Sequence, residues 1–399
     1  MSLREKIEHE IRAHGPIPFS RYMEICLYDP ELGYYSRNAT QFGKAGDFYT
    51  SSDVHAVFGR LLARQFEEMW RALGSPAQIE VRELGPGRGL FAQDVLDWSE
   101  EKFPDFFRAL HYTLIERSPA LRRRIESALE RHLNSGKARM AAPENSDGLT
   151  DGKVTTAVVP ESRRTDGTLA AEVPVLLFAN EFFDALPVEI LSNRGSLHIA
   201  TENGRFLETW APPSNDDLEF LDCYSIHPEE NERIEIPLVA QRHADELFST
   251  LNRGLAIVID YGYTRNEQLA GRHRGTLKAI RQHSVSADPY EAPGEQDITA
   301  DVNFTALAAI AERHGLQTHK LITQSQFLLG IGEATEFADA FEGCRLPQER
   351  AKVALQLKHL VTPAGMGESF HVLLASKGVE KEKVSTLAGL SFGKNARIS

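Results

Sequence analysis

The amino-acid sequence predicts an α/β fold built on a doubly wound sheet, and three observations lead to this prediction. Short runs typical of strands recur along the chain, at 79–84, 111–116, 174–179 and 255–260. The last two are nearly continuously apolar, as strands covered on both faces require. Amphipathic helical segments separate these runs. A glycine turn over 85–89 directly follows the first run. Strand–helix repeats of this kind place a ligand site at the carboxyl edge of the sheet.

Further strands are expected outside these runs, at 138–140, near 317–323 and at 370–376. The order of the elements predicts a sheet that ends in an antiparallel hairpin. Before the first strand, helices are predicted around a long loop, whose length is typical of lids and binding loops. A β-hairpin is expected to turn at Asn203 and Gly204, because Asn-Gly between strand-forming residues favours a tight turn.

The chain divides on this basis into a core with two insertions. The predicted segments are 1–75, an N-terminal helical and lid segment; 76–191, the first part of the core; 192–250, a β-hairpin insertion; 251–323, the second part of the core; 324–366, a helical insertion; 367–378, the last core strand; and 379–399, a tail.

Composition narrows the class of protein. The 399-residue chain has a formal net charge of −13, which disfavours a nucleic-acid groove and mildly favours a cationic partner. Its cysteines, Cys26, Cys223 and Cys344, match neither a metal motif nor a disulfide framework. No apolar stretch reaches the roughly 18 residues that span a bilayer, and residues 1–19 resemble neither a signal nor a transit peptide. A cytoplasmic protein without membrane insertion is therefore expected.

The glycine turn indicates which cofactor the site takes. Gly85, Gly87 and Gly89 follow the spacing G-x-G-x-G, whereas a dinucleotide site requires G-x-G-x-x-G. Glu83, two residues before the first glycine, would repel a pyrophosphate but can accept a hydrogen bond from a cationic α-amino group. S-adenosylmethionine carries such a group, and the E-L-G-x-G-x-G pattern resembles the first motif of class I methyltransferases. A NAD-type site and a purely structural turn are the alternatives.

Glu116 follows the second predicted strand and is our candidate ligand for the ribose hydroxyls of the cofactor. Its distance downstream of the glycine turn fits a strand–helix–strand unit. In the alternative interpretation, Glu116 opens the following helix, where an acid complements the helix dipole.

Polar residues follow the strand at 174–179, namely Asn180, Glu181 and Asp184. Ligands of open α/β sheets bind at this edge, so these residues are candidates to hold the methyl acceptor. Paired carboxylates such as Glu181 and Asp184 can bind a guanidinium by bidentate hydrogen bonds and orient one nitrogen. The alternative is a helix N-cap by Asn180 or Asp184, with Phe182 and Phe183 in the core.

Another polar stretch, 295–301, is predicted as a loop that lines the substrate cleft. Asp301 precedes a helix and is a candidate cap, whereas Glu295 and Asp297 have no such structural role. In the lid loop, Asp47, Thr50 and Ser51 are expected to contact the cofactor, with hydroxyls near its carboxylate. Tyr34 and Tyr35 are interpreted as packing residues, and Arg281 and His283 as residues that close the cleft.

Several segments in the same order resemble the MidA family of class I methyltransferases, from about residue 16 to residue 377. They are PIPFSRYMEICLYDPELGYY, FGKAGDFYTSSDV, ELGPGRG, NEFFDALPV, GTLKAIRQH, PGEQDITADVNF and MGESFHVLLAS. The resemblance implies a class I methyltransferase Rossmann-like fold, S-adenosyl-L-methionine as cofactor and methylation of protein arginine. In mitochondrial members it also implies a role in assembling respiratory complex I, with one of its subunits as substrate.

The expected catalytic residues are therefore Asn180, Glu181, Asp184 and Asp297, with no metal. Methyl transfer from a sulfonium is an in-line displacement that needs an oriented nucleophile and acids to manage the guanidinium proton. One alternative is an assembly chaperone that binds a partner and S-adenosylmethionine with little turnover. Another is NAD-dependent reduction, which the glycine spacing opposes. The sequence leaves the oligomeric state open.

Overall fold

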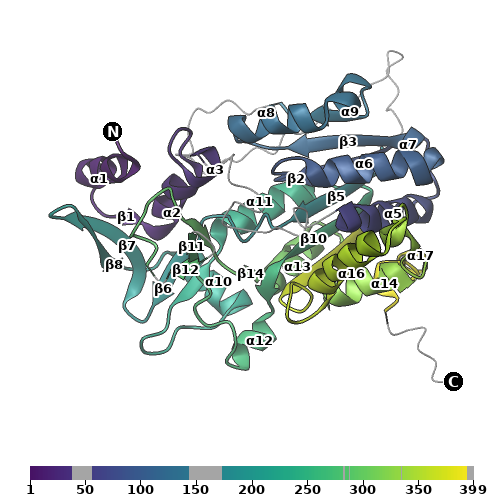
Figure 1. The fold of residues 1–399 in the computed structure, drawn as a ribbon. Coiled ribbons are helices and arrows are strands. Elements are labelled where there is room, and N and C mark those ends of the chain that lie inside the picture. The colour runs from purple at the N-terminus through teal and green to yellow at the C-terminus, as the bar shows by residue number, and fades with distance from the viewer. Residues whose placement is uncertain (38–55, 143–172, 282–283, 287, 334, 393–399) are drawn as a thin grey trace, which may run out of the picture.

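The computed structural model describes residues 1–37, 56–142, 173–281, 284–286, 288–333 and 335–392. Its central sheet runs, in spatial order, β4-β3-β2-β5-β10-β17-β15, with helices on both faces (Figure 1). The strands have these bounds: β2 (Ile79–Leu84), β3 (Leu110–Ile115), β4 (Ala138–Met140), β5 (Val175–Asn180), β10 (Gly254–Tyr263), β15 (Gln317–Thr318), β16 (Ile322–Thr323) and β17 (Phe370–Lys377).

The pairing of these strands confirms the predicted fold class. From β4 to β10 the strands are parallel, and β17 runs antiparallel to β10. On its other edge β17 pairs antiparallel with β15 and β16, which together replace the single strand predicted near 317–323. The sheet therefore ends in the expected antiparallel arrangement.

Side chains alternate between the two faces of the sheet along each strand, and the core clusters show which helices cover each face. Val81 and Ile257 belong to one core cluster, whereas Ala256 and Val258 belong to the other, as a period of two requires. The first face is covered by α5 (Ala56–Ala72), α6 (Leu90–Lys102), α14 (Gln324–Glu333) and α16 (Pro347–Val361), and the second by α11 (Leu238–Ser249) and α13 (Phe304–Arg313). Among the described residues, none of these or the other helices is long and apolar enough to cross a membrane.

The N-terminal segment packs on the first insertion at one end of the central sheet (Figure 1). The short β1 (Ile17–Pro18) pairs antiparallel with β7 of the insertion. The predicted hairpin is present, with Asn203 (φ 50°) and Gly204 (φ 75°) in its turn. This region contains α1 (Leu3–His14), α2 (Phe19–Tyr28), α3 (Tyr34–Arg37), β6 (Glu189–Ser192), β7 (Gly195–Glu202), β8 (Arg205–Ala211), α10 (Asn215–Tyr224) and β9 (Ile234–Ile236).

The prediction that 295–301 is entirely a loop is wrong. Asp297–Thr299 forms β13, which pairs with β11 (Lys278–Arg281), and β11 pairs with β12 (Ser284–Ser286). The short β14 (Val302–Asn303) then extends β10 in parallel. Strands this short are defined by long-range pairing rather than by local periodicity. The remaining helices are α7 (Pro104–Ala109), α8 (Pro119–Ala128), α9 (Glu130–Asn134), α12 (Arg265–Leu269), α15 (Ala338–Phe341), α17 (Lys381–Ser385) and the 3₁₀ turn Ala388–Leu390.

Candidate active site at the carboxyl edge of the sheet

The glycine turn leaves room for a ligand at the end of β2. Gly85, Gly87 and Gly89 all have positive φ, at 60°, 55° and 77°, a conformation that glycine adopts without steric cost. A side chain at Gly85 would meet the ring of Phe182 at 2.9 Å, whereas nothing lies within 4 Å of one at Gly87. Gly89 caps α6 without a side-chain hydrogen bond, so this helix end can present backbone N–H groups to a ligand.

Glu83 lies buried beside this turn. Its side chain accepts a hydrogen bond from the hydroxyl of Tyr112 at 2.8 Å, and its residue is only 4% exposed. Burial, together with the charge of Glu116, raises the pKa of the Glu83 carboxyl to about 8. At neutral pH this carboxyl is therefore mostly protonated until a cation approaches it.

Glu116 follows β3 at the same edge, where Leu84 and Ile115 are paired. Burial raises the pKa of its carboxyl to about 7, although it accepts the N–H of Ser118 at 2.8 Å. Ser118, not Glu116, caps α8, because its hydroxyl accepts the N–H of Leu121 at 3.4 Å. Glu116 therefore lies outside the helix that the alternative interpretation assigned to it.

The polar residues after β5 form a tight turn rather than a helix. Asn180 ends the strand, and its amide nitrogen donates to a carboxylate oxygen of Glu181 at 3.0 Å. Glu181 has a left-handed backbone, with φ 50°, which is uncommon for a residue with a side chain. The side-chain oxygen of Asn180 is buried and has no hydrogen-bond partner among the described residues. The N-cap alternative for this segment is therefore wrong.

Asp260 at the end of β10 holds this turn in place. One of its carboxylate oxygens accepts N–H groups from three successive residues, Phe182 at 3.2 Å, Phe183 at 2.9 Å and Asp184 at 3.3 Å. The other accepts the N–H of Tyr261 at 2.9 Å. Asp260 is fully buried, so it satisfies backbone donors that would otherwise be unpaired. From the sequence, Asp260 is only the last residue of the strand predicted at 255–260.

The acids predicted for the acceptor site, namely Glu181, Asp184 and Asp297, lie close together and form the acceptor cluster. Burial raises the pKa of Asp184 well above its ordinary value, and the charges of Asp260, Glu181, Asp297 and Asp301 raise it further. Asp184 and Asp297 are 7% and 6% exposed, so their mutual repulsion is weakly screened. A cluster of carboxyl groups at one sheet edge is suited to bind a cation.

Tyr35 packs against the N-terminal core, as its interpretation as a packing residue predicts, and it is also part of this cluster. Its hydroxyl donates to a carboxylate oxygen of Asp297 at 3.0 Å. Tyr34 is buried, at 4% exposed, in agreement with a packing role. An aromatic residue gives no sequence signal of a hydroxyl partner more than 250 positions away.

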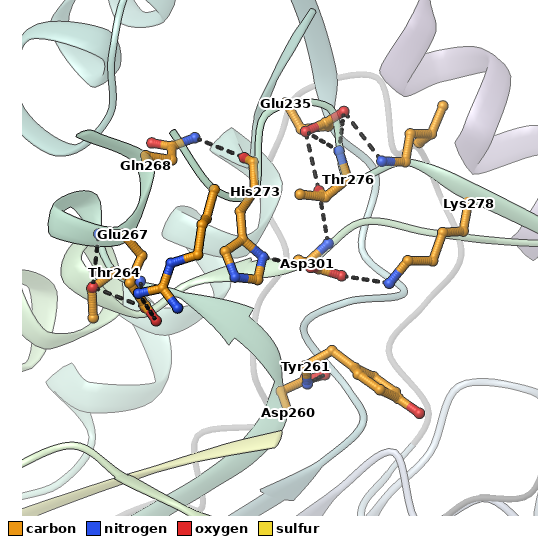
Figure 2. Close-up of polar contacts among 12 residues, drawn as sticks. Glu235, Asp260, Tyr261, Thr264, Glu267, Gln268, His273, Thr276, Lys278 and Asp301 are labelled. Atoms are coloured by element: carbon orange, nitrogen blue, oxygen red, sulfur yellow. Dashed lines mark hydrogen bonds and ion pairs between the residues drawn. The ribbon is translucent and has the colours of Figure 1, made fainter. Parts of the chain in front are cut away.

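The sequence suggested that Asp301 caps the following helix, and this prediction is wrong. Asn303 does so, since its side-chain oxygen accepts the N–H of Ala306 at 3.0 Å. Figure 2 shows Asp301 between two basic side chains instead, with Lys278 Nζ at 2.9 Å and His273 Nδ1 at 3.1 Å. The ammonium of Lys278 also lies 5.4 Å from the ring centre of Tyr261. Asp301 thus belongs to a separate, charge-paired network beside the acceptor cluster.

Other predicted residues lie apart from the cluster or outside the described residues. Arg281 pairs with Glu295 at 2.6 Å on the surface, and Glu295 also lies 3.9 Å from the guanidinium of Arg37. Asp47, Thr50, Ser51 and His283 are outside the described residues. Within the described part of the chain, no group of His, Cys, Asp or Glu side chains is arranged to hold a metal ion.

The sheet order, the glycine turn and the acids at the carboxyl edge define a class I methyltransferase. Comparison with known sequences gives the family: residues 61–322 match the sequence model of a family described as S-adenosyl-L-methionine-dependent methyltransferases. The match covers most of the chain, and the chain belongs to this family. The cofactor is S-adenosyl-L-methionine, and the NAD alternative is wrong.

Two curated relatives and a solved structure extend over nearly the whole chain. The Drosophila melanogaster protein named protein arginine methyltransferase NDUFAF7 homolog, mitochondrial, is 31% identical over 95% of this chain and 85% of its own. The protein arginine methyltransferase NDUFAF7, mitochondrial, of Homo sapiens is 28% identical over 91% of this chain and 80% of its own. A crystal structure from Burkholderia thailandensis, bound to S-adenosyl-homocysteine, is 26% identical with a TM-score of 0.77, and covers 98% of this chain and 94% of its own.

The comparisons correct the expected localisation. The curated relatives carry the word mitochondrial in their names, which contradicts the prediction of a cytoplasmic protein. That prediction relied on the residue pattern at 1–19, which forms α1 and β1 and packs in the core, so the pattern reflects packing rather than the compartment.

Proposed function

We propose that this enzyme transfers the methyl group of S-adenosylmethionine to an arginine side chain of a protein. The observation that carries the proposal is the cluster of three acids, the buried Asp184 and Asp297 and the partly buried Glu181, at the same sheet edge as the glycine turn. A guanidinium is a planar cation with several N–H donors, which carboxylates bind in bidentate geometry. The names of the curated relatives support the same substrate class.

We assign the cofactor to the edge formed by β2 and β3. S-adenosylmethionine, when bound, supplies a methyl group on a sulfonium centre. The backbone from Gly85 to Gly89 would bind its amino-acid part, with Glu83 accepting a hydrogen bond from the ammonium. Glu116 would accept hydrogen bonds from the ribose hydroxyls. The lid residues Asp47, Thr50 and Ser51 stay predicted contacts.

We assign the acceptor guanidinium to the turn after β5. Glu181 and Asp184 would hold it and orient one nitrogen toward the cofactor edge, with Asn180 close by. A carboxylate whose pKa is raised is a stronger base than an exposed one. Asp184 is therefore suited to take the proton that the nitrogen loses, with Asp297 as a second carboxylate on the cation.

The substrate protein follows from the resemblance of the sequence to the MidA family. A subunit of respiratory complex I is our prediction, and a role in assembling that complex follows from it. The net charge of −13 is compatible with a cationic target.

Glu181→Gln is expected to lower kcat/KM about 100-fold, because it removes a charged hydrogen bond worth about 2 to 3 kcal/mol. Methylation is measured with tritium-labelled S-adenosylmethionine and recombinant complex I subunits, and the labelled residue is identified after hydrolysis. Glu295→Gln is the control, since this surface acid pairs with Arg281 and its loss should change turnover less than threefold. Label on lysine, glutamine or a carboxyl group instead of arginine would contradict the proposal.

Binding of S-adenosylhomocysteine is expected to release roughly one proton at pH 7. With a pKa of about 8, the Glu83 carboxyl is largely protonated at pH 7, and with a pKa of about 7 the Glu116 carboxyl is partly protonated. Ligand binding favours the ionised form of both carboxyls, so they lose these protons. Affinity should therefore fall as the pH is lowered through this range. Calorimetric titrations in phosphate, HEPES and Tris give the number of protons from the dependence of the enthalpy on the buffer.

Two comparisons make this test specific. Glu83→Gln should remove most of the released protons, and at pH 9.5 the intact protein should release almost none, because both carboxyls are already ionised. A binding enthalpy that is the same in all three buffers at pH 7 would show that these carboxyls do not face the ligand.

A further inference from the structure

The one-turn helix α3 contacts both the proposed cofactor edge and the acceptor cluster. The backbone carbonyl of Tyr35 accepts a hydrogen bond from the hydroxyl of Ser118 at 3.3 Å. Ser118 in turn donates its N–H to Glu116 at 2.8 Å. At the other end of the same residue, the Tyr35 hydroxyl donates to Asp297 at 3.0 Å. A single residue therefore connects the β3 edge with a carboxylate that comes from β13.

A second tyrosine reinforces this connection. Tyr28, at the end of α2, donates its hydroxyl to the carbonyl of Ala185 at 2.8 Å, directly after the acceptor turn. Its ring centre lies 5.5 Å from that of Tyr35. Burial raises the pKa of Tyr28, and the charges of Asp297, Asp184 and Glu116 add to the shift. The tyrosine pair thus lies among acids of both sites.

Besides the buried Tyr34, these contacts hold α3 in place. It has only four residues, Tyr34–Arg37, and a helix of this length is not stable by itself in water. A ligand that orders Glu116 and Ser118 will therefore also favour the position of Tyr35 in which its carbonyl accepts the Ser118 hydroxyl. Such coupling is reciprocal, so an occupied acceptor cluster would in turn favour ligand binding at Glu116.

We propose that Tyr35 is a positioning residue that couples occupancy of the cofactor edge to the placement of Asp297. The proposal rests on the function proposed above, which assigns Glu116 to the cofactor and Asp297 to the acceptor. In this arrangement, cofactor binding stabilises the contact between Ser118 and the Tyr35 carbonyl, and the Tyr35 hydroxyl then fixes the Asp297 carboxylate for the acceptor.

Hydrogen exchange of the full-length protein with and without S-adenosylhomocysteine tests this coupling. In the intact protein, the ligand should slow exchange at 116–122 and also at 297–300, which it does not contact directly. In Tyr35→Phe, protection at 116–122 should remain, whereas the slowing at 297–300 should fall about fivefold, a typical coupling magnitude. Affinity for S-adenosylhomocysteine, measured by calorimetry, should change less than threefold.

Tyr290→Phe is the matched control, because its hydroxyl also donates to a carboxylate at 3.0 Å, that of Glu208. This variant should keep the ligand effect at 297–300. The coupling is wrong, and the cofactor assignment stands, if Tyr35→Phe also keeps the ligand-induced slowing of exchange at 297–300. The same conclusion follows if the ligand protects 116–122 of the intact protein but does not slow exchange at 297–300. If the ligand binds without protecting 116–122, both the cofactor assignment and the coupling are wrong.

Discussion

Asp260→Ala is expected to lower kcat/KM for methyl transfer about 1000-fold, a loss of about 4 kcal/mol in transition-state stabilisation, while S-adenosylhomocysteine still binds. The Asp260 carboxylate accepts N–H groups from Phe182, Phe183 and Asp184. Without it these buried donors lose their acceptor, at about 1 to 3 kcal/mol each. The turn should then relax, and Glu181 should leave the left-handed conformation that it holds at φ 50°.

Methylation kinetics, calorimetry with S-adenosylhomocysteine and thermal unfolding together test this expectation. Asp260→Asn keeps one acceptor oxygen and should recover part of the lost turnover. Asp339→Ala is the control for removing a buried acid, since Asp339 pairs with Arg64 between α5 and α15. It should lower the melting temperature without lowering turnover of the folded enzyme. Normal methylation by Asp260→Ala would show that the turn does not need its acceptor.

Gly87→Leu is expected to weaken binding of S-adenosylhomocysteine at least about 100-fold, or about 2.7 kcal/mol. Nothing lies within 4 Å of a Cβ added at Gly87, so a side chain can leave the backbone there, and the leucine then occupies the space proposed for the cofactor. The positive φ of 55° adds strain, which the experiment must separate from the steric effect.

Gly136→Leu provides that separation. Gly136 has a similar φ of 72° and nothing within 4 Å of an added Cβ. It precedes β4, so it lies at the amino ends of the parallel strands, away from the carboxyl edge. Both variants should lose similar stability, whereas only Gly87→Leu should lose ligand binding in calorimetry. If both bind the ligand as the intact protein does, the glycine turn is not the cofactor site.

The same variant distinguishes the enzyme from the alternative assembly chaperone. A methyltransferase requires Gly87 for its activity on the substrate protein. A scaffold would keep binding its partner in pull-down experiments and keep supporting assembly although Gly87→Leu no longer binds the cofactor. Loss of both methylation and assembly in Gly87→Leu, with partner binding intact, would favour the enzyme.

The sequence determined the features of this protein that depend on local patterns. The strand Ile79–Leu84 has the predicted bounds, because its apolar positions and the glycine turn after it identify a buried strand. The hairpin at Asn203 and Gly204 follows from the backbone that these residues adopt. Glycine spacing and an acid before the turn indicated the cofactor for the same reason, since both lie within one strand–turn–helix unit.

Tertiary structure decided which residues meet across long stretches of chain. Asp260 binds backbone N–H groups more than 70 positions away, and Tyr35 reaches Asp297 from the N-terminal segment. Asp301 pairs with Lys278 and His273 because β11 and β13 are neighbours. No local periodicity records such pairings, because they depend on strand order and on how far each side chain reaches. The sequence therefore indicated which edge of the sheet carries the predicted site, and the packing of distant segments determined which acids lie there together.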